Sequence, residues 1–176
     1  MLRPFNGKHP QLEQGAWIDE TAVLIGDVQV REEASVWPAS VLRGDVNRIE
    51  IGARTNIQDG TIVHVTHDGP YTPGGIPTLV GEDVTVGHRA IIHACTIGNR
   101  VLVGMGAVLM DGAVVEDDVI IGGGSLVSPG KRLLSGRLYV GSPARAVREL
   151  NAREREHLVY SARHYVQVKQ QHEAGS

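Results

Sequence analysis

An aliphatic residue returns at every sixth position through the second half of the chain. The register runs through Ile91, Ile97, Val103, Leu109, Val115, Ile121 and Val127. This spacing matches neither the two-residue alternation of a strand nor the helical turn of about 3.6 residues. It is typical of hexapeptide β-helices, in which short straight segments are joined by regular corners and each coil stacks on the next. The repeat therefore predicts a parallel β-helix with an aliphatic core.

The same register occurs earlier in the chain, with two interruptions. Inward aliphatics are predicted at Ile18, Leu24, Val30, Val36 and Leu42, and again at Ile51, Ile57 and Val63. The first interruption covers residues 43–49. The second covers residues 66–77, which are rich in glycine and proline and predict a loop that leaves the solenoid at a corner. Loops on a rigid scaffold often carry function.

The interior of the predicted prism is narrow. Two positions before the aliphatics stand the small or slim residues Cys95, Val101, Ala107, Ala113, Val119 and Ser125. The 22 glycines suit tight corners because they lack a Cβ. We interpret Cys95 as a buried structural thiol rather than a metal ligand, because it occupies this small inward slot.

The pattern changes after Gly141, and we divide the chain there. Residues 1–141 form the predicted β-helix domain, and residues 142–176 form a C-terminal helical segment packed on the prism. Ser142 and Pro143 are typical of a helix start. We expect one helix to about Leu150 and a second from about Ala152.

Composition limits the function classes. A net charge of −3 offers no electrostatic reason to expect nucleic acid or an anionic membrane as a partner. The single cysteine excludes an intrachain disulfide. Neither a cleavable signal sequence nor an apolar run of membrane-spanning length is visible, so we expect a cytoplasmic protein.

Three of the eight histidines, His64, His88 and His93, stand beside buried-type aliphatics. Three neutral imidazoles and one water form a catalytic zinc set. His64 and His93 are 29 residues apart. Without the loop of about eleven residues this leaves about 18, one turn of three hexapeptides, which predicts that they stack on one face.

His88 is five residues from His93 in a repeat of six, so the two should occupy neighbouring faces and point apart. A metal site would then need His88 from a second prism, and a three-fold ring is the simplest closed arrangement. By spacing alone, solvated surface histidines remain the alternative.

Several motifs, in order along nearly the whole chain, resemble the γ-class carbonic anhydrase family, including its bacterial branch of carbonic anhydrase-like hexapeptide proteins. They are Arg43-Gly44-Asp45, Asn56-Ile57-Gln58-Asp59-Gly60, Gly87-His88 with His93, and Gly141-Ser142-Pro143-Ala144-Arg145. The resemblance implies a left-handed parallel β-helix and a homotrimer with a metal at each interface. His64 and His93 would come from one subunit and His88 from its neighbour. Zinc is the metal expected by default, and iron or cobalt also serves this family.

The implied activity is a lyase reaction, the reversible hydration of carbon dioxide to bicarbonate by a metal-bound hydroxide. By resemblance, Gln58 would orient the reacting oxygen, and Asn56 would support it. Arg43 would supply positive charge for bicarbonate or pair with Asp59 across the interface, and Asp45 would hold the arginine. Alternatively, Arg43, Asp45 and Asp59 form an ion-pair network that only fixes the trimer.

The departures from the family bear on rate. Its most active prototype has a glutamate where this chain has Val46, and another in an acidic loop that transfers protons. Here the loop offers only His67 and Asp68 as titrating groups, so either His67 transfers the proton or turnover is slow. The sequence does not place Tyr165 relative to the site. Two other functions remain open, an acyl-coenzyme A thioesterase or acyltransferase on the same scaffold and a non-catalytic metal-binding trimer.

Overall fold

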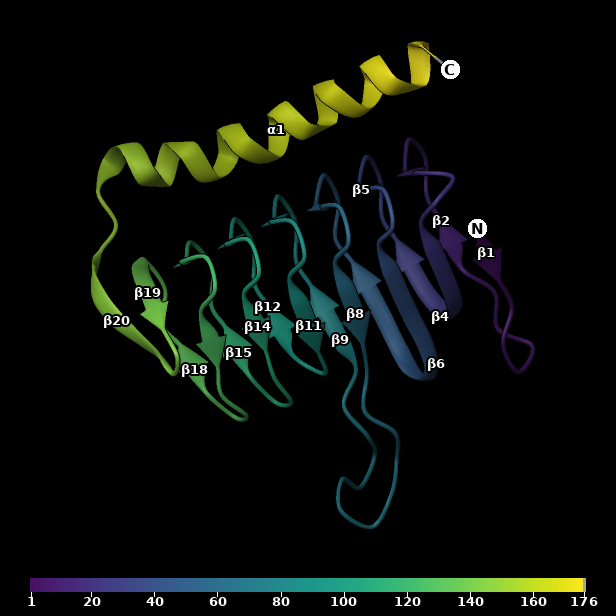
Figure 1. Ribbon diagram of the computed structural model, residues 1–176, viewed down its shortest axis with the longest axis horizontal. Coiled ribbons are helices and arrows are strands. Elements are labelled where there is room, and N and C mark those ends of the chain that lie inside the picture. Colours follow the sequence, from purple (N-terminus) through teal and green to yellow (C-terminus); the bar gives the residue numbers. More distant parts are fainter. Residues whose placement is uncertain (176) are drawn as a thin grey trace.

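The computed structural model describes residues 1–175 and is a parallel β-solenoid of about eight turns with one C-terminal helix (Figure 1). The hexapeptide repeats indicate a left-handed β-helix, as expected. Its strands stack in three rows, one on each side of a triangular prism. Residue 176, the last of the predicted C-terminal segment, lies outside the described residues.

Two of the rows share long strands and so form one twelve-stranded sheet. The first row contains β8 (Ile62–His64), β11 (Ile91–His93), β14 (Val108–Leu109) and β17 (Leu126–Val127). The second contains β9 (Thr78–Val80), β12 (Thr96–Ile97), β15 (Val114–Val115) and β18 (Arg132–Leu133). The strands β4 (Val23–Val30) and β6 (Val41–Ile51) take part in both rows, and β1 (Leu2–Arg3) and β2 (Gln11–Leu12) pair with β4.

The third row is an eight-stranded sheet that ends in a hairpin. Its strands are β3 (Trp17–Ile18), β5 (Ser35–Val36), β7 (Asn56–Ile57), β10 (Thr85–Val86), β13 (Leu102–Val103), β16 (Ile120–Ile121), β19 (Arg137–Gly141) and β20 (Ala144–Glu149). All pairs in this sheet are parallel except β19 with β20. Most coils therefore contribute one short strand to each row, whereas β4 and β6 each serve two rows.

The core follows the six-residue register except at one coil. Ile97 is buried as predicted, but the prediction of an inward Ile91 is wrong, since Ile91 is 42% exposed and Ile92 is 0% exposed. In most other coils the positive-φ corner residue follows the inward aliphatic by three positions, as Gly112 follows Leu109, whereas Ala94, with φ 47°, follows Ile92 by two. A slip of one residue in a strand moves a side chain to the opposite face. The early corner therefore turns Ile91 outward.

Both predicted interruptions are seen. β6 runs without a break through residues 43–49, but its pairing with β4 shifts register between Gly26 and Val28, so residues 45–48 bulge outward. Residues 66–77 form the long loop that projects from the edge of the prism opposite the helix (Figure 1). Backbone hydrogen bonds between Thr66 and Ile76 close the base of this loop.

The predicted helix up to Leu150 is wrong. Residues 144–149 form β20, which pairs antiparallel with β19, and Pro143 lies in the turn between them after a cis peptide bond. The strand β19 is the last of its row and would otherwise leave its backbone groups unpaired. The second predicted helix is confirmed as α1 (Ala152–Ala174), with Asn151 as its N-cap.

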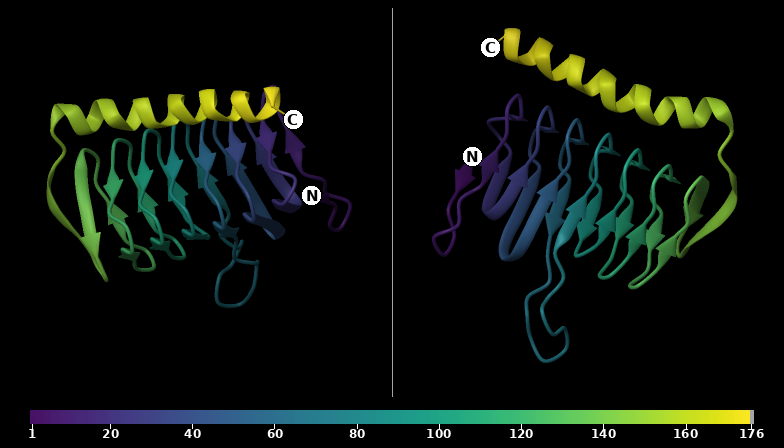
Figure 2. Two further views of the ribbon diagram at one scale, coloured as in Figure 1. Left: turned by 45° about the horizontal axis from the view of Figure 1, so that its top comes forward. Right: turned by 180° about the vertical axis from the view of Figure 1, so that it is seen from behind.

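α1 runs back along the length of the solenoid, over the eight-stranded sheet (Figures 1 and 2). Leu158 and Ala162 are buried residues of this helix. Trp37 lies against Tyr165 of the helix, with ring centroids 5.4 Å apart. Lys169 is buried and its Nζ lies 2.8 Å from Glu33 Oε2, which ties the end of the helix to an early coil. Among the described residues, no helix combines the length and apolar character needed to cross a membrane.

Candidate metal centre

His64 and His93 lie side by side on one face of the prism. They end the parallel strands β8 and β11 and are direct partners in the pairing register. His64 Nδ1 is 3.2 Å from His93 Nε2, and the ring centroids are 5.2 Å apart. The predicted stacking of this pair is confirmed.

A carboxylate contacts the other nitrogen of each ring. Asp45 Oδ1 lies 3.1 Å from His64 Nε2, and Asp111 Oδ1 lies 2.7 Å from His93 Nδ1. Metal-ligating histidines commonly use the second ring nitrogen in this way. The two nitrogens that face each other, His64 Nδ1 and His93 Nε2, are therefore the ones left for a metal.

Burial and charge both act on this pair. Burial, which disfavours the imidazolium, lowers the pKa of His64 despite the opposing effect of Asp45. Burial would raise the pKa of Asp45, but hydrogen bonds from Arg43 and His64 outweigh it, so its pKa is lowered. Arg43 Nη1 donates to Asp45 Oδ2 at 2.5 Å. The arrangement favours a neutral imidazole beside an ionised carboxylate, the protonation states that metal ligation requires.

His88 lies apart from this pair, in the corner between β10 and β11. Its Nδ1 is 2.8 Å from Asp59 Oδ2. Within residues 1–175, no three His, Cys, Asp or Glu side chains are arranged to hold one metal ion. One chain therefore carries two separate groups of candidate ligands, called half-sites below: a histidine pair with Asp45 and Asp111, and a single histidine with Asp59.

Gln58 and Asn56 belong to the half-site of His88. A hollow of about 270 Å³ lies beside Gln58, His88, Met105 and Tyr165. Gln58 Nε2 donates to Asn56 Oδ1 at 3.0 Å, and Asn56 Nδ2 donates to Thr85 Oγ1 at 3.1 Å. This chain of hydrogen bonds fixes the orientation of the buried Gln58 amide.

Tyr165 comes to this hollow from α1, a placement that the sequence did not supply. Burial, followed by the nearby charge of Asp59, raises the pKa of its phenol. The neutral phenol is therefore favoured at the edge of the hollow.

Sequence reasoning missed Asp111, although a signal was present. Asp111 follows His93 by 18 residues, the length of one full turn, so the two lie in adjacent coils. Cys95, in contrast, is buried as predicted, and burial raises the pKa of its thiol to about 12. A protonated, enclosed thiol is a poor metal ligand.

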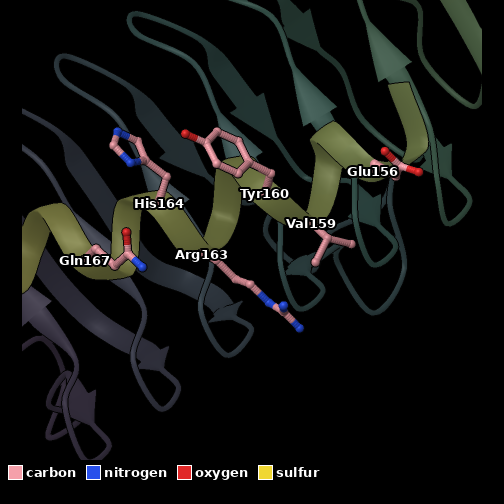
Figure 3. Close-up of a pocket in the computed structure, with 6 residues that line it drawn as sticks. All are labelled: Glu156, Val159, Tyr160, Arg163, His164 and Gln167. Atoms are coloured by element: carbon pink, nitrogen blue, oxygen red, sulfur yellow. The ribbon is translucent and has the colours of Figure 1, made fainter. Parts of the chain in front are cut away.

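A second hollow, of about 440 Å³, lies on α1 (Figure 3). Its lining comes entirely from the helix: Glu156, Val159, Tyr160, Arg163, His164 and Gln167. None of the predicted site residues lines this hollow. It is therefore not part of the candidate metal centre.

The donor set of the two half-sites fits a metal of the zinc type. Each of the three imidazoles has one nitrogen against a carboxylate, which leaves one nitrogen for a metal. His64 and His93 already direct these nitrogens toward each other. The third imidazole, that of His88, lies apart from this pair and contacts Asp59.

Comparisons with known proteins support the hexapeptide-repeat fold and the family. A family described as bacterial transferase hexapeptide (six repeats) matches residues 94–129. The chain is 55% identical to protein YrdA of Escherichia coli over 98% of this chain and 94% of that protein. It is 43% identical to the mitochondrial γ carbonic anhydrase 2 of Arabidopsis thaliana, over 94% of this chain and 59% of that longer protein.

A solved structure is similar over the whole fold. The crystal structure of a hexapeptide transferase family protein from Anaplasma phagocytophilum has a TM-score of 0.89 and 42% sequence identity. The match covers 97% of this chain and 96% of that protein. A protein whose description names the hexapeptide transferase family therefore has the same overall fold.

Proposed function

Because the chain belongs to the γ-class carbonic anhydrase-like family of hexapeptide-repeat proteins, we propose that it is a metal-dependent enzyme that interconverts carbon dioxide and bicarbonate. The sites lie at the interfaces of a homotrimer in the cytoplasm. His64 and His93 of one subunit and His88 of its neighbour hold the metal, with zinc as the expected ion. The observation that carries this proposal is the facing pair of nitrogens on His64 and His93, each ring backed by its own carboxylate.

The surface beside the histidine pair supports trimer formation. Ile62 and Ile91 are adjacent, outward-facing and about two-fifths exposed on the same strands as His64 and His93. Val108 continues this apolar stripe on β14. Contiguous exposed apolar surface on a soluble protein commonly marks an interface. A second prism that covers this stripe would bring a foreign corner next to the histidine pair.

When bound, zinc supplies the Lewis acidity that makes water a nucleophile near neutral pH. The chain's own residues would prepare the site around it. Asp45 and Asp59 would set the tautomers of the neutral His64 and His88 rings, so that the nitrogen away from the carboxylate carries the lone pair for a metal.

Gln58 would orient the reacting oxygen. One of its two amide N–H groups donates to Asn56, which sets the orientation of the amide and leaves the carbonyl oxygen free as an acceptor. Because Asn56 is itself held by Thr85, the acceptor does not rotate away. Such fixed polar groups stabilise developing charge without reorganising during the reaction.

Arg43 would attract and retain the anionic product. Its guanidinium is exposed, next to Asp45 and close enough to affect the pKa of His64. The same pair can also contribute to the trimer interface, so the two roles predicted for Arg43 are compatible.

We expect this chain to turn over more slowly than the most active members of its family. The exposed residue that follows Asp45 in the bulge is Val46, and a valine side chain cannot take up or release a proton. The ring of His67 is folded against Gly69 within the loop. Proton export limits a fast anhydrase, and this chain places no carboxylate at Val46 for that step.

The test is metal content together with carbon dioxide hydration, on protein purified without chelator. We expect about one zinc per trimer interface, thus about one per chain, and measurable hydration. His88→Ala should lose both, whereas His157→Ala, an exposed histidine of α1, should lose neither. A wild-type protein that binds no metal would contradict the proposal.

The hollow favours a second candidate, hydrolysis or transfer of an acyl thioester. At about 270 Å³, with Leu102 and Met105 in its lining, it has room for a group larger than carbon dioxide. Acetyl-coenzyme A turnover, measured by thiol release, tests this function. Bound metal with thioester turnover and no hydration would select it, and bound metal with neither activity would indicate a non-catalytic trimer.

A further inference from the structure

Thr66, Asp111 and His93 form one continuous contact. Asp111 Oδ1 accepts from His93 Nδ1 at 2.7 Å, and the hydroxyl of Thr66 donates to Asp111 Oδ2. Both oxygens of the carboxylate are therefore engaged. Asp111 lies in the corner after β14, one coil beyond His93, so no local chain segment links the three residues. A carboxylate held at both oxygens has little freedom to rotate.

The contact determines which nitrogen of His93 carries the proton. A carboxylate accepts hydrogen bonds only, so Nδ1 carries the proton, and in the neutral ring Nε2 is then the nitrogen with the free lone pair. The bare Nε2 is the atom that faces His64 Nδ1. Without Asp111 the ring would be free to adopt the other tautomer, which protonates the nitrogen needed for a metal.

The contact also reaches the long loop. Thr66 is its first residue, and its backbone pairs with Ile76 at the base. Asn47, in the bulge of β6, donates from Nδ2 to Thr66 O at 3.2 Å. The loop and the bulge therefore both converge on the residue that holds Asp111.

We propose that Asp111 is a positioning residue, which fixes the Nδ1–H tautomer and the orientation of His93, and that Thr66 couples the loop of residues 66–77 to this contact. The role of Asp111 in metal binding rests on the proposed function. Its effect on the His93 ring does not, because the contact exists within one chain and without a metal.

The experiment compares Asp111→Ala, Asp111→Asn and Thr66→Val with wild type. Asp118→Asn is the matched control, since Asp118 is a corner aspartate that pairs with Arg100 instead of a histidine. The first readout is the zinc dissociation constant, measured by competition with a chelator. The second is the tautomer of His93 in the metal-free full-length protein, read from long-range ¹H–¹⁵N correlation spectra. Amide hydrogen exchange at residues 66–77 is the third.

We expect Asp111→Ala to weaken zinc binding by about 10–100-fold and to give a mixture of His93 tautomers. Asp111→Asn should restore part of the loss, because its amide oxygen still accepts from Nδ1–H. Thr66→Val should accelerate exchange in the loop. Asp118→Asn should match wild type in zinc affinity and tautomer.

Loss of thermal stability in Asp111→Ala, with unchanged zinc affinity and an unchanged His93 tautomer, would overturn the proposal. Unaltered loop exchange in Thr66→Val would overturn the coupling. If wild type itself bound no zinc, the proposed function would fail, whereas a tautomer shift in Asp111→Ala would still support the positioning role. Failure of the proposed function can thus be distinguished from failure of the positioning role of Asp111.

Discussion

The Nδ1 atom of His64 lies 3.2 Å from the Nε2 atom of His93, although 29 residues separate them in the chain. Parallel pairing of β8 with β11 brings the two backbones into register, and Asp45 and Asp111 hold the opposite sides of the rings. Two imidazoles of the proposed metal site are therefore already held together within one chain. His88, which contacts Asp59, lies apart from them, and the proposed sharing of ligands between subunits has testable consequences.

Mixed trimers test the division directly. His88→Ala and His93→Ala trimers should each be inactive, because every interface lacks one ligand. In any mixed trimer, one interface joins the intact pair of a His88→Ala subunit to the intact His88 of a His93→Ala subunit. An equal mixture should regain about one quarter of wild-type hydration, measured by stopped flow. No recovery in verified mixed trimers would mean that the ligands do not come from two chains.

Replacing Gln58 should impair the reaction without removing the metal. Gln58→Ala should lower kcat by roughly 100-fold, because the polar group that orients the reacting oxygen is lost. Asn56→Ala should have a smaller effect, since it only frees the Gln58 amide to rotate. Kinetics and zinc content on the same samples check this, with Gln29→Ala as the control far from the half-sites. Equal kcat values for Gln58→Ala and wild type would contradict the assigned role.

A charge on the apolar stripe should prevent assembly. Ile91→Asp and Ile62→Asp place a carboxylate on the surface that we expect a second prism to cover, and burying an unpaired charge is costly. Both variants should elute as monomers and lose metal binding. Tyr71→Asp, at a loop residue that is 98% exposed, should remain trimeric. Light scattering provides the mass, and a trimeric Ile91→Asp would place the interface elsewhere.

Glu154 should make the start of α1 sensitive to acid. A hydrogen bond from Arg148 and another from the Asn151 amide hold the pKa of Glu154 at about 2, below its usual 4.5. Because the folded pKa is the lower one, the stabilisation is present above pH 4.5 and is lost as the pH falls towards 2. Glu154→Gln should therefore have a lower Tm than wild type at pH 7, and the difference should shrink between about pH 4.5 and pH 2.

Circular dichroism of the helix provides this measurement, with Glu156→Gln as the control on the same helix. A difference in Tm that stayed constant across the acidic range would show that the charge of Glu154 is not what stabilises the helix.

The parts of the candidate site that follow the six-residue repeat could be predicted from the sequence. With three six-residue segments to a turn, the repeat stacks His64 beside His93 in neighbouring coils and puts His88 on a different face. The same arithmetic would have paired Asp111 with His93. It does not indicate that Thr66 contacts Asp111, because the loop begins there and its path is not periodic. Nor does it place Tyr165, whose position depends on how α1 lies across the prism.

The solenoid, most of the inward aliphatics and the helix that begins at Ala152 could be predicted from the sequence, because each depends on contacts that recur at a fixed spacing or lie within a few residues. The early corner at Ala94 and the pairing of residues 144–149 with β19 were visible only in the folded molecule. An early corner is tolerated when neighbouring coils hold it, and a terminal segment becomes a strand when an unpaired edge lies beside it. Both depend on residues distant in the chain, which local propensity does not report.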